Sequence, residues 1–143
     1  MKIWKFVNII QIYKEIEKIS GKNKNVTPIN LVNQIISTLE DSKANDIISI
    51  DLRKKSSIAD YMIIAEGNST RQVSSIAQKV IEKLKKLNIK KISYEGLIRC
   101  DWVLLDAGDI IVNIFRPEIR QFYNLERIWM REGNAETIII GND

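Results

Sequence analysis

Residues 102–115 constrain the fold most, because they have the pattern of a β-hairpin whose two faces differ in chemistry. Two runs of β-forming residues flank Ala107 and Gly108, and glycine supplies the positive φ that a two-residue hairpin loop needs. With Asp106 and Asp109 as the closing pair, the two-residue period of a strand fixes the direction of every side chain. One face is then wholly aliphatic and carries Val103, Leu105, Ile110, Val112 and Ile114.

The opposite face of this hairpin mixes an indole, carboxylates and an amide with apolar groups. Its members are Trp102, Leu104, Asp106, Asp109, Ile111, Asn113 and Phe115. Protein-binding surfaces commonly combine aromatic and polar side chains in this way. We therefore expect this face to be available to a partner. The alternative is that the C-terminal segment of the same chain covers Trp102.

The chain has the length and composition of one globular domain. It has 143 residues, 45% of them hydrophobic and 28% charged, which is enough to bury a core. The single cysteine, Cys100, excludes an intrachain disulfide framework and fits a reducing compartment. No apolar run has the length of a membrane span, and the N-terminus lacks the pattern of a secretory signal. We expect a cytoplasmic protein without a membrane partner.

The net charge of +4 lies entirely in the first 25 residues. Residues 1–25 carry six lysines and two glutamates, whereas the rest of the chain has 16 basic and 16 acidic residues. A neutral domain has no surplus charge to neutralise phosphates, so we expect direct RNA contact to be minor or absent. The lysine cluster within residues 83–91 is interpreted as a solvated face. Residues 1–25 are interpreted as a solvated or loosely docked helix. The alternative is that they touch RNA or a membrane surface.

Three segments are expected in the chain: a basic extension over 1–25, a domain over 26–131 and a tail over 132–143. In the tail, residues 137–140 are either an edge strand or disordered. Within the domain, helical and strand-like patterns alternate, which favours an α/β fold with a mixed sheet flanked by helices. Helices are expected at 28–41, after Ser69, from Pro117 and in a final turn reaching Trp129, and strands at 47–52, 61–65, 90–94 and in the hairpin.

The search for catalytic residues is negative. The chain has no histidine, and Cys100 has no base to activate it, so we expect it to be a partly buried structural residue. The turn at residues 67–69 opens a helix after a strand, as at a nucleotidyltransferase site, but that chemistry needs two nearby carboxylates for metal ions. No acid follows Ser69 before Glu82. We therefore expect no catalytic residue, no metal ligand and no cofactor.

Arg71 is unusual because it occupies the first turn of a helix, where a positive charge opposes the helix dipole. Its placement indicates an anionic neighbour. The candidates are Asp60, Glu66 and a group on a partner.

Four blocks of sequence together resemble the hallmark motifs of the ribosomal silencing factor (Iojap-like) family. They are residues 56–72, Glu95-Gly96, residues 101–113 and residues 120–129. Their order and spacing match the family between Pro28 and Trp129. The chain departs from the family pattern at Ala107, where a bulky apolar residue is usual, and at Asn113, where histidine is usual.

The resemblance implies a translation repressor with a nucleotidyltransferase-like topology that lacks the catalytic acids. Such a protein would bind the large ribosomal subunit through its fourteenth protein, block subunit joining sterically, and form a homodimer when free. The family's ribosome-facing surface would map onto the Trp102 strand and the turn after it, with Trp102 as the apolar anchor. The expected partner-binding residues are Arg71, Trp102, Leu104, Asp106, Ala107, Asp109 and Asn113. The alternatives are residual nucleotide binding or nucleotidyl transfer at residues 67–71, and a role in large-subunit assembly.

Overall fold

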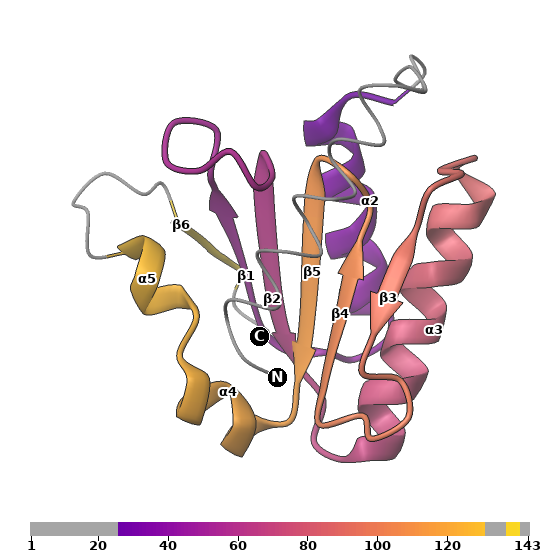
Figure 1. The fold of residues 1–143 in the computed structure, drawn as a ribbon. Helices are drawn as coiled ribbons and strands as arrows, with labels where there is room; N and C mark the ends of the chain where they lie inside the picture. The colour runs from indigo at the N-terminus through magenta and orange to yellow at the C-terminus, as the bar shows by residue number, and fades with distance from the viewer. Residues whose placement is uncertain (1–25, 131–136, 141–143) are drawn as a thin grey trace.

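The structure is a computed structural model that describes residues 26–130 and 137–140 (Figure 1). Predictions for residues 1–25 and for the remainder of the tail lie outside the described residues. The elements are α2 (Pro28–Asp41), β1 (Asn45–Asp51), β2 (Tyr61–Glu66), α3 (Thr70–Lys86), β3 (Ser93–Glu95), β4 (Trp102–Asp106), β5 (Ile110–Phe115), α4 (Pro117–Tyr123), α5 (Glu126–Met130) and β6 (Thr137–Ile140).

These strands form one mixed sheet in the order β3-β4-β5-β2-β1-β6. Strands β2 and β5 pair in parallel at its centre, and the other neighbours pair antiparallel. The predicted α/β fold with a mixed sheet is therefore confirmed. Strand β6 pairs with β1 at one edge, so the first of the two alternatives for residues 137–140 is correct.

Local sequence signals position the two long helices. Helix α2 has the predicted bounds, with Pro28 in its first turn and Thr27 Oγ1 accepting a hydrogen bond from Asn30 N at 3.4 Å. At the start of α3, Ser69 Oγ accepts from Gln72 N at 3.1 Å, as predicted for a capping box. The return bond differs, because Gln72 Oε1 accepts from the backbone of Asn68 rather than Ser69.

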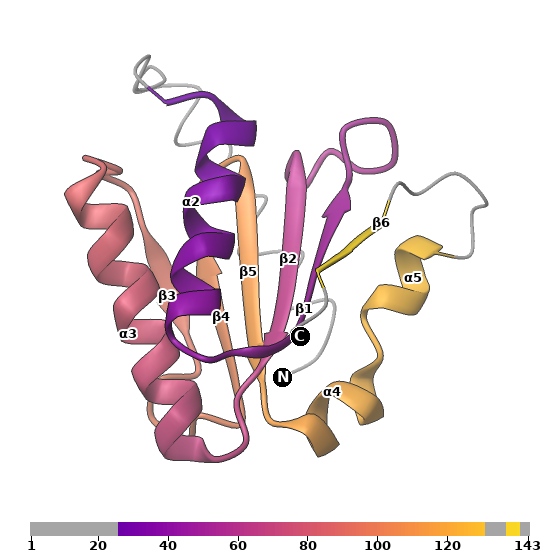
Figure 2. The same cartoon turned by 180° about the vertical axis from the view of Figure 1, so that it is seen from behind.

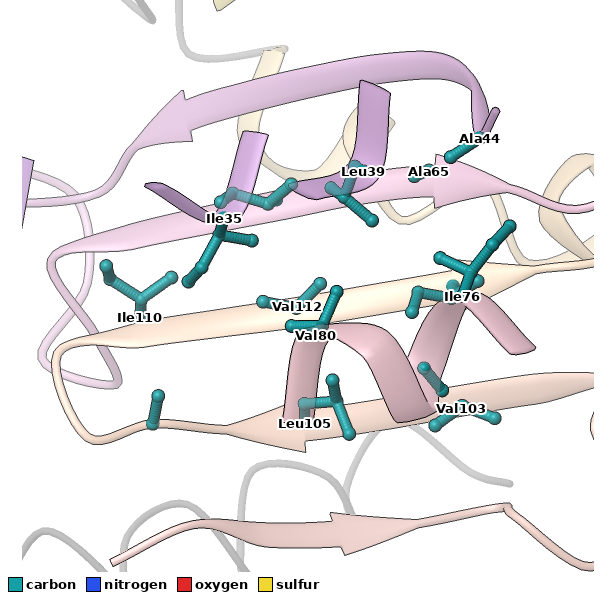
Figure 3. Packing of buried hydrophobic residues seen from close by; sticks show 14 of the residues in the cluster. Ile35, Leu39, Ala44, Ala65, Ile76, Val80, Val103, Leu105, Ile110 and Val112 are labelled. Atoms are coloured by element: carbon teal, nitrogen blue, oxygen red, sulfur yellow. The ribbon is translucent and has the colours of Figure 1, made fainter. Parts of the chain in front are cut away.

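Both faces of the sheet are covered. Helices α2 and α3 lie on one face (Figures 1 and 2), and Figure 3 shows their side chains interleaved with those of the strands. Apolar side chains from Ile119 to Trp129, in α4, α5 and their connection, pack on the other face. Strand β2 is buried through Ala65, as its continuously apolar sequence predicts. The strand predicted over 90–94 is shorter than expected and becomes edge strand β3.

The β4–β5 hairpin has the predicted faces but a different register. Asp106 pairs with Ile111, and Ala107 N donates to Ile110 O at 2.9 Å, so the loop residues are Gly108 and Asp109. The predicted closing pair of Asp106 and Asp109 is therefore wrong. A shift of two residues in the pairing leaves each side chain on its original face, because strand side chains alternate with a period of two.

Candidate docking surface around the β4–β5 hairpin

The mixed face of the hairpin is not open to solvent. Trp102 is 5% exposed, Leu104 2%, Asp106 3% and Asn113 0%. The expectation that this face is available to a partner is wrong for these four side chains. The alternative, in which the C-terminal segment covers Trp102, is correct.

Aromatic stacking explains this burial. The Trp102 ring lies 4.8 Å from the ring of Phe115 on β5 and 4.9 Å from that of Tyr123 on α4. Ile119 and Trp129 pack against the same cluster. Covering an aromatic ring and its neighbours is favourable by several kcal/mol in total, about 25 cal/mol for each Å² of apolar surface. The short C-terminal helices therefore gain more by covering Trp102 than by leaving it exposed.

The polar groups on this face form hydrogen bonds inside the fold. Trp102 Nε1 donates a hydrogen bond to Asn113 Oδ1 at 2.8 Å. A buried indole needs such an acceptor, which gives Asn113 a structural reason to stand in an apolar layer. The Nδ2 atom of Asn113 has no hydrogen-bond partner within the described part of the chain.

Asp106 holds the hairpin turn, and its Oδ1 accepts from Gly108 N at 2.8 Å. Gly108 has φ of +84°, which glycine adopts without strain. Ala107 is 7% exposed and belongs to the core under α2 and α3, so its expected place on a partner surface is also wrong.

Asp109 differs from Asp106 and Ala107, the other expected site residues near the turn, because it remains partly exposed. Its backbone oxygen accepts from Asp60 N at 2.8 Å and from Tyr61 N at 3.1 Å. These bonds tie the turn to the start of β2. The Asp109 carboxylate is therefore presented on a backbone that two hydrogen bonds hold in place.

Arg71 is exposed in the first turn of α3. It forms no ion pair with another described residue, and the expected neighbour Glu66 is engaged by Arg120 instead. Arg71 thus remains accessible. Neither intramolecular candidate, Asp60 or Glu66, forms an ion pair with it, and the third alternative, a group on a partner, stays a prediction.

A buried arginine is the main polar feature that the sequence did not indicate. Arg120 on α4 is 8% exposed; its Nε donates to Glu126 Oε1 at 2.7 Å, and its Nη1 donates to Glu66 Oε1 at 3.1 Å and to Asp46 O at 2.7 Å. Burial raises the pKa of Glu66, and the positive charge of Arg120 opposes that rise. The one signal in the sequence is Glu66 itself, an acid that ends an apolar strand.

The turn at residues 67–69 is used structurally. A Cβ atom on Gly67 would lie 2.9 Å from Val73 N, so glycine permits the close approach of this turn to α3. Ser69 caps the helix. Among residues 26–130 and 137–140, no group of three or more acidic or cysteine side chains could hold a metal ion. No helix in those ranges is long and apolar enough to span a membrane. Cys100 is buried, as expected, and its thiol donates to Leu97 O at 2.9 Å.

Comparison with known proteins gives consistent relatives. Residues 25–142 match the family described as "Ribosomal silencing factor during starvation", which extends past Trp129 into the tail. The ribosomal silencing factor of Zymomonas mobilis is 50% identical over 113 residues, covering 77% of this chain and 85% of that protein. A mouse protein named "Mitochondrial assembly of ribosomal large subunit protein 1" is 29% identical over 101 residues, covering 68% of this chain and 44% of that protein.

The fold has a close match among solved structures. A crystal structure of a Chromobacterium violaceum protein aligns with a TM-score of 0.71 at 38% identity. The alignment covers 73% of this chain and 88% of that one.

Proposed function

This chain belongs to the ribosomal silencing factor family, and we propose that it represses translation by binding the large ribosomal subunit and blocking subunit joining. The contact is with the fourteenth protein of that subunit. The action is steric and non-catalytic, and it takes place in the cytoplasm. Family membership supports the ribosomal role, and the structural use of Gly67 and Ser69 supports a mechanism without nucleotide chemistry.

The observation that carries the docking site is the fixed acidic turn of the hairpin. Asp109 offers a partly exposed carboxylate, and hydrogen bonds from the backbone of Asp60 and Tyr61, at the start of β2, hold its backbone in place. A charge on a rigid support loses little conformational entropy on binding. Ribosomal proteins are rich in basic side chains, so Asp109 complements such a partner. Exposed Arg71 lies at the start of α3, at the opposite end of the sheet from this turn, so its contact would be a separate one.

The buried residues of the predicted site act indirectly in this proposal. Trp102, Leu104 and Asn113 support the hairpin against α4 and α5, while Asp106 and Ala107 fix its turn. Trp102 is therefore a positioning residue, because the partner cannot reach its ring in this arrangement. Its truncation would disturb both the fold and the docking surface.

Co-sedimentation with purified large subunits tests the proposal. Asp109→Lys should weaken pelleting and change its salt dependence, because charge reversal at an interface slows association. Glu40→Lys, at an exposed position on α2, makes the same charge change away from the hairpin and should pellet like the wild type. Equal pelleting of the two variants would contradict the assignment of the docking site to this turn. A wild-type protein that does not pellet would remove the ribosomal function.

Subunit joining is the second measurement. The wild type should reduce the yield of joined ribosomes when it is added to separated subunits. Binding without any effect on joining would favour a role in assembly, which the printed name of the mouse relative suggests for that protein. Preferential binding to immature large subunits would point the same way.

Two further parts of the proposal have simple tests. Titration calorimetry with nucleoside triphosphates and magnesium should give no binding heat, and a measurable heat would revive the nucleotide-binding alternative.

We also propose that the free protein is a homodimer. Light scattering should then give about twice the mass of the 16.5 kDa chain.

A further inference from the structure

Residues 83–91 hold five lysines and no acidic residue. Elsewhere in the range 26–130 there are 10 basic and 13 acidic residues, so the rest of this range is net negative. The near-neutral total therefore conceals a strongly segregated charge. We call Lys83, Lys85, Lys86, Lys90 and Lys91 the basic patch.

The basic patch is exposed and largely uncompensated. Lys85, Lys86 and Lys90 are exposed, and Lys83 is half-buried. None of these four forms an ion pair with another described residue. The charge of these four lysines is thus available to an outside group.

Helix stability explains only part of this pattern. Lys83, Lys85 and Lys86 occupy the last turn of α3, where positive charge is favourable to the helix dipole. Lys90 and Lys91 lie beyond the C-cap residue Leu87 and gain much less from it. The helix dipole therefore does not account for the lysines that follow the helix.

The basic patch adjoins the proposed docking turn. Strand β3 follows the patch, and its first residue, Ser93, pairs with Asp106 at the end of β4. Figure 1 shows the end of α3, the start of β3 and the β4–β5 turn at the same end of the sheet. Tyr94, the middle residue of this edge strand, is 55% exposed. An aromatic side chain beside lysines is a common arrangement for binding single-stranded RNA.

We propose that the basic patch binds the phosphate backbone of ribosomal RNA next to the protein contact, with Tyr94 available for stacking on a base. This inference rests on the proposed function, and it makes docking bipartite, with an acidic turn for a basic protein and a basic patch for RNA. A lipid surface fits less well. The apolar residues between the lysines, Leu84, Leu87 and Ile89, pack into the core and leave no face to insert into a bilayer.

A matched pair of double variants tests the patch in the full-length chain. Lys86→Gln with Lys90→Gln removes two charges from it, and Lys43→Gln with Lys54→Gln removes two elsewhere. Binding of a labelled single-stranded RNA is followed by fluorescence anisotropy between about 50 and 200 mM KCl. Each phosphate contact contributes about 0.7 to the slope of log affinity against log salt. The patch variant should therefore have a slope flatter by about 1.4, whereas the control variant should keep the wild-type slope.

Tyr94→Leu tests stacking without changing charge. It should weaken RNA binding by about fivefold to a hundredfold with an unchanged salt slope, because stacking on a base does not depend on counterion release. Thermal unfolding checks that each variant remains folded. Equal slopes for the two double variants would overturn the basic patch as a specific site. Patch-dependent binding to phosphatidylserine vesicles, without patch-dependent RNA binding, would overturn it in favour of a membrane.

Large-subunit pelleting over the same salt range separates this inference from the proposed function. The patch variant should pellet with a weaker salt dependence than the wild type. If the wild type pellets and the patch variant has an identical salt dependence, the ribosomal RNA contact is wrong and the proposed function stands. If the wild type binds RNA through the patch but does not pellet, the proposed function fails and only the RNA site remains.

Discussion

At the scale of single residues, the pairing of Trp102 with Asn113 shows how a polar group is kept in an apolar layer. The indole N–H donates to Asn113 Oδ1 at 2.8 Å, and both side chains are buried. Losing one partner leaves the other unsatisfied, at a cost of about 1–3 kcal/mol. Losing both with apolar replacements of similar size is nearly neutral. The pair therefore behaves as a unit.

A double-mutant cycle checks this coupling. Trp102→Phe should lower the free energy of unfolding by about 1–3 kcal/mol beyond the loss of ring area, because Asn113 Oδ1 loses its donor. Asn113→Leu should cost a similar amount in the wild-type background, and less when Trp102→Phe is already present. Urea unfolding of the four proteins gives the interaction energy. Additive costs would show that the hydrogen bond does not couple the two sites.

Glu66 makes stability depend on pH. Burial raises the pKa of its carboxyl above 4.5 in the folded chain. The folded state then binds more protons than the unfolded state between 4.5 and the raised value, so the free energy of unfolding falls as pH rises through that window. Below 4.5 the carboxyl is protonated in both states, so the free energy of unfolding no longer changes with pH through this group. Arg120 moderates the effect without reversing it.

Glu66→Gln should remove this pH dependence while keeping an acceptor for Arg120. The stability of the variant relative to the wild type should therefore increase as pH rises above 4.5. Urea unfolding in a series of buffers across that value measures the difference. Glu118→Gln, whose side chain is 71% exposed, serves as the control for removing one carboxylate. A constant difference between Glu66→Gln and wild type at all pH values would contradict the prediction.

At the scale of elements, Arg120 joins α4 to the sheet and to α5. Its side chain donates hydrogen bonds to Glu66 at the end of β2, to the backbone oxygen of Asp46 near the start of β1, and to Glu126 at the start of α5. Buried ion pairs add little net stability over apolar packing, but breaking one leaves uncompensated charge inside. The network is therefore more important for the position of α4 and α5 than for the total stability.

Removing Arg120 alone should be worse than removing the whole network. Arg120→Met should cost about 3–5 kcal/mol, because Glu66 and Glu126, whose side chains are mostly covered, lose their cation. The triple variant with Glu66→Gln and Glu126→Gln should recover part of this loss. Urea unfolding at neutral pH compares the two. A triple variant less stable than the single one would mean that the ion pairs stabilise the fold by themselves.

The elements also show which parts of the fold the sequence determines. Caps and periodic apolar residues predicted α2 and α3, and alternation placed the side chains of β4 and β5 on the correct faces. The register could not be obtained in this way, because a shift of two residues preserves both faces.

Burial of the mixed face could not be predicted from the hairpin itself. The covering elements, α4 and α5, have seven and five residues, too few for an amphipathic pattern to show which surface they contact. The composition of the mixed face was typical of a docking surface, but the same aromatic and amide groups also form a satisfied interior when a short segment covers them.

At the scale of the whole molecule, the two faces of the sheet are stabilised very differently. One is covered by helices of 14 and 17 residues, and the other by two short helices that depend on one aromatic cluster and one buried arginine. Strands β2 and β5 lie between the two layers at the centre of the sheet. Local opening should therefore begin on the α4–α5 side and reach β2 and β5 last.

Hydrogen exchange should reveal this order. Amides of β2 and β5 should exchange only through global unfolding, because both strands are almost fully buried and paired on both sides. Amides of α4 and α5 should exchange faster by orders of magnitude. Arg120→Met should accelerate the exchange of α4 and α5 further. In β5 it should lower protection only as much as it lowers the global free energy of unfolding. Mass spectrometry of peptic fragments resolves these segments. Protection of α5 equal to that of β5 in the wild type would mean that the C-terminal helices unfold only with the sheet, and that Trp102 is never uncovered without global unfolding.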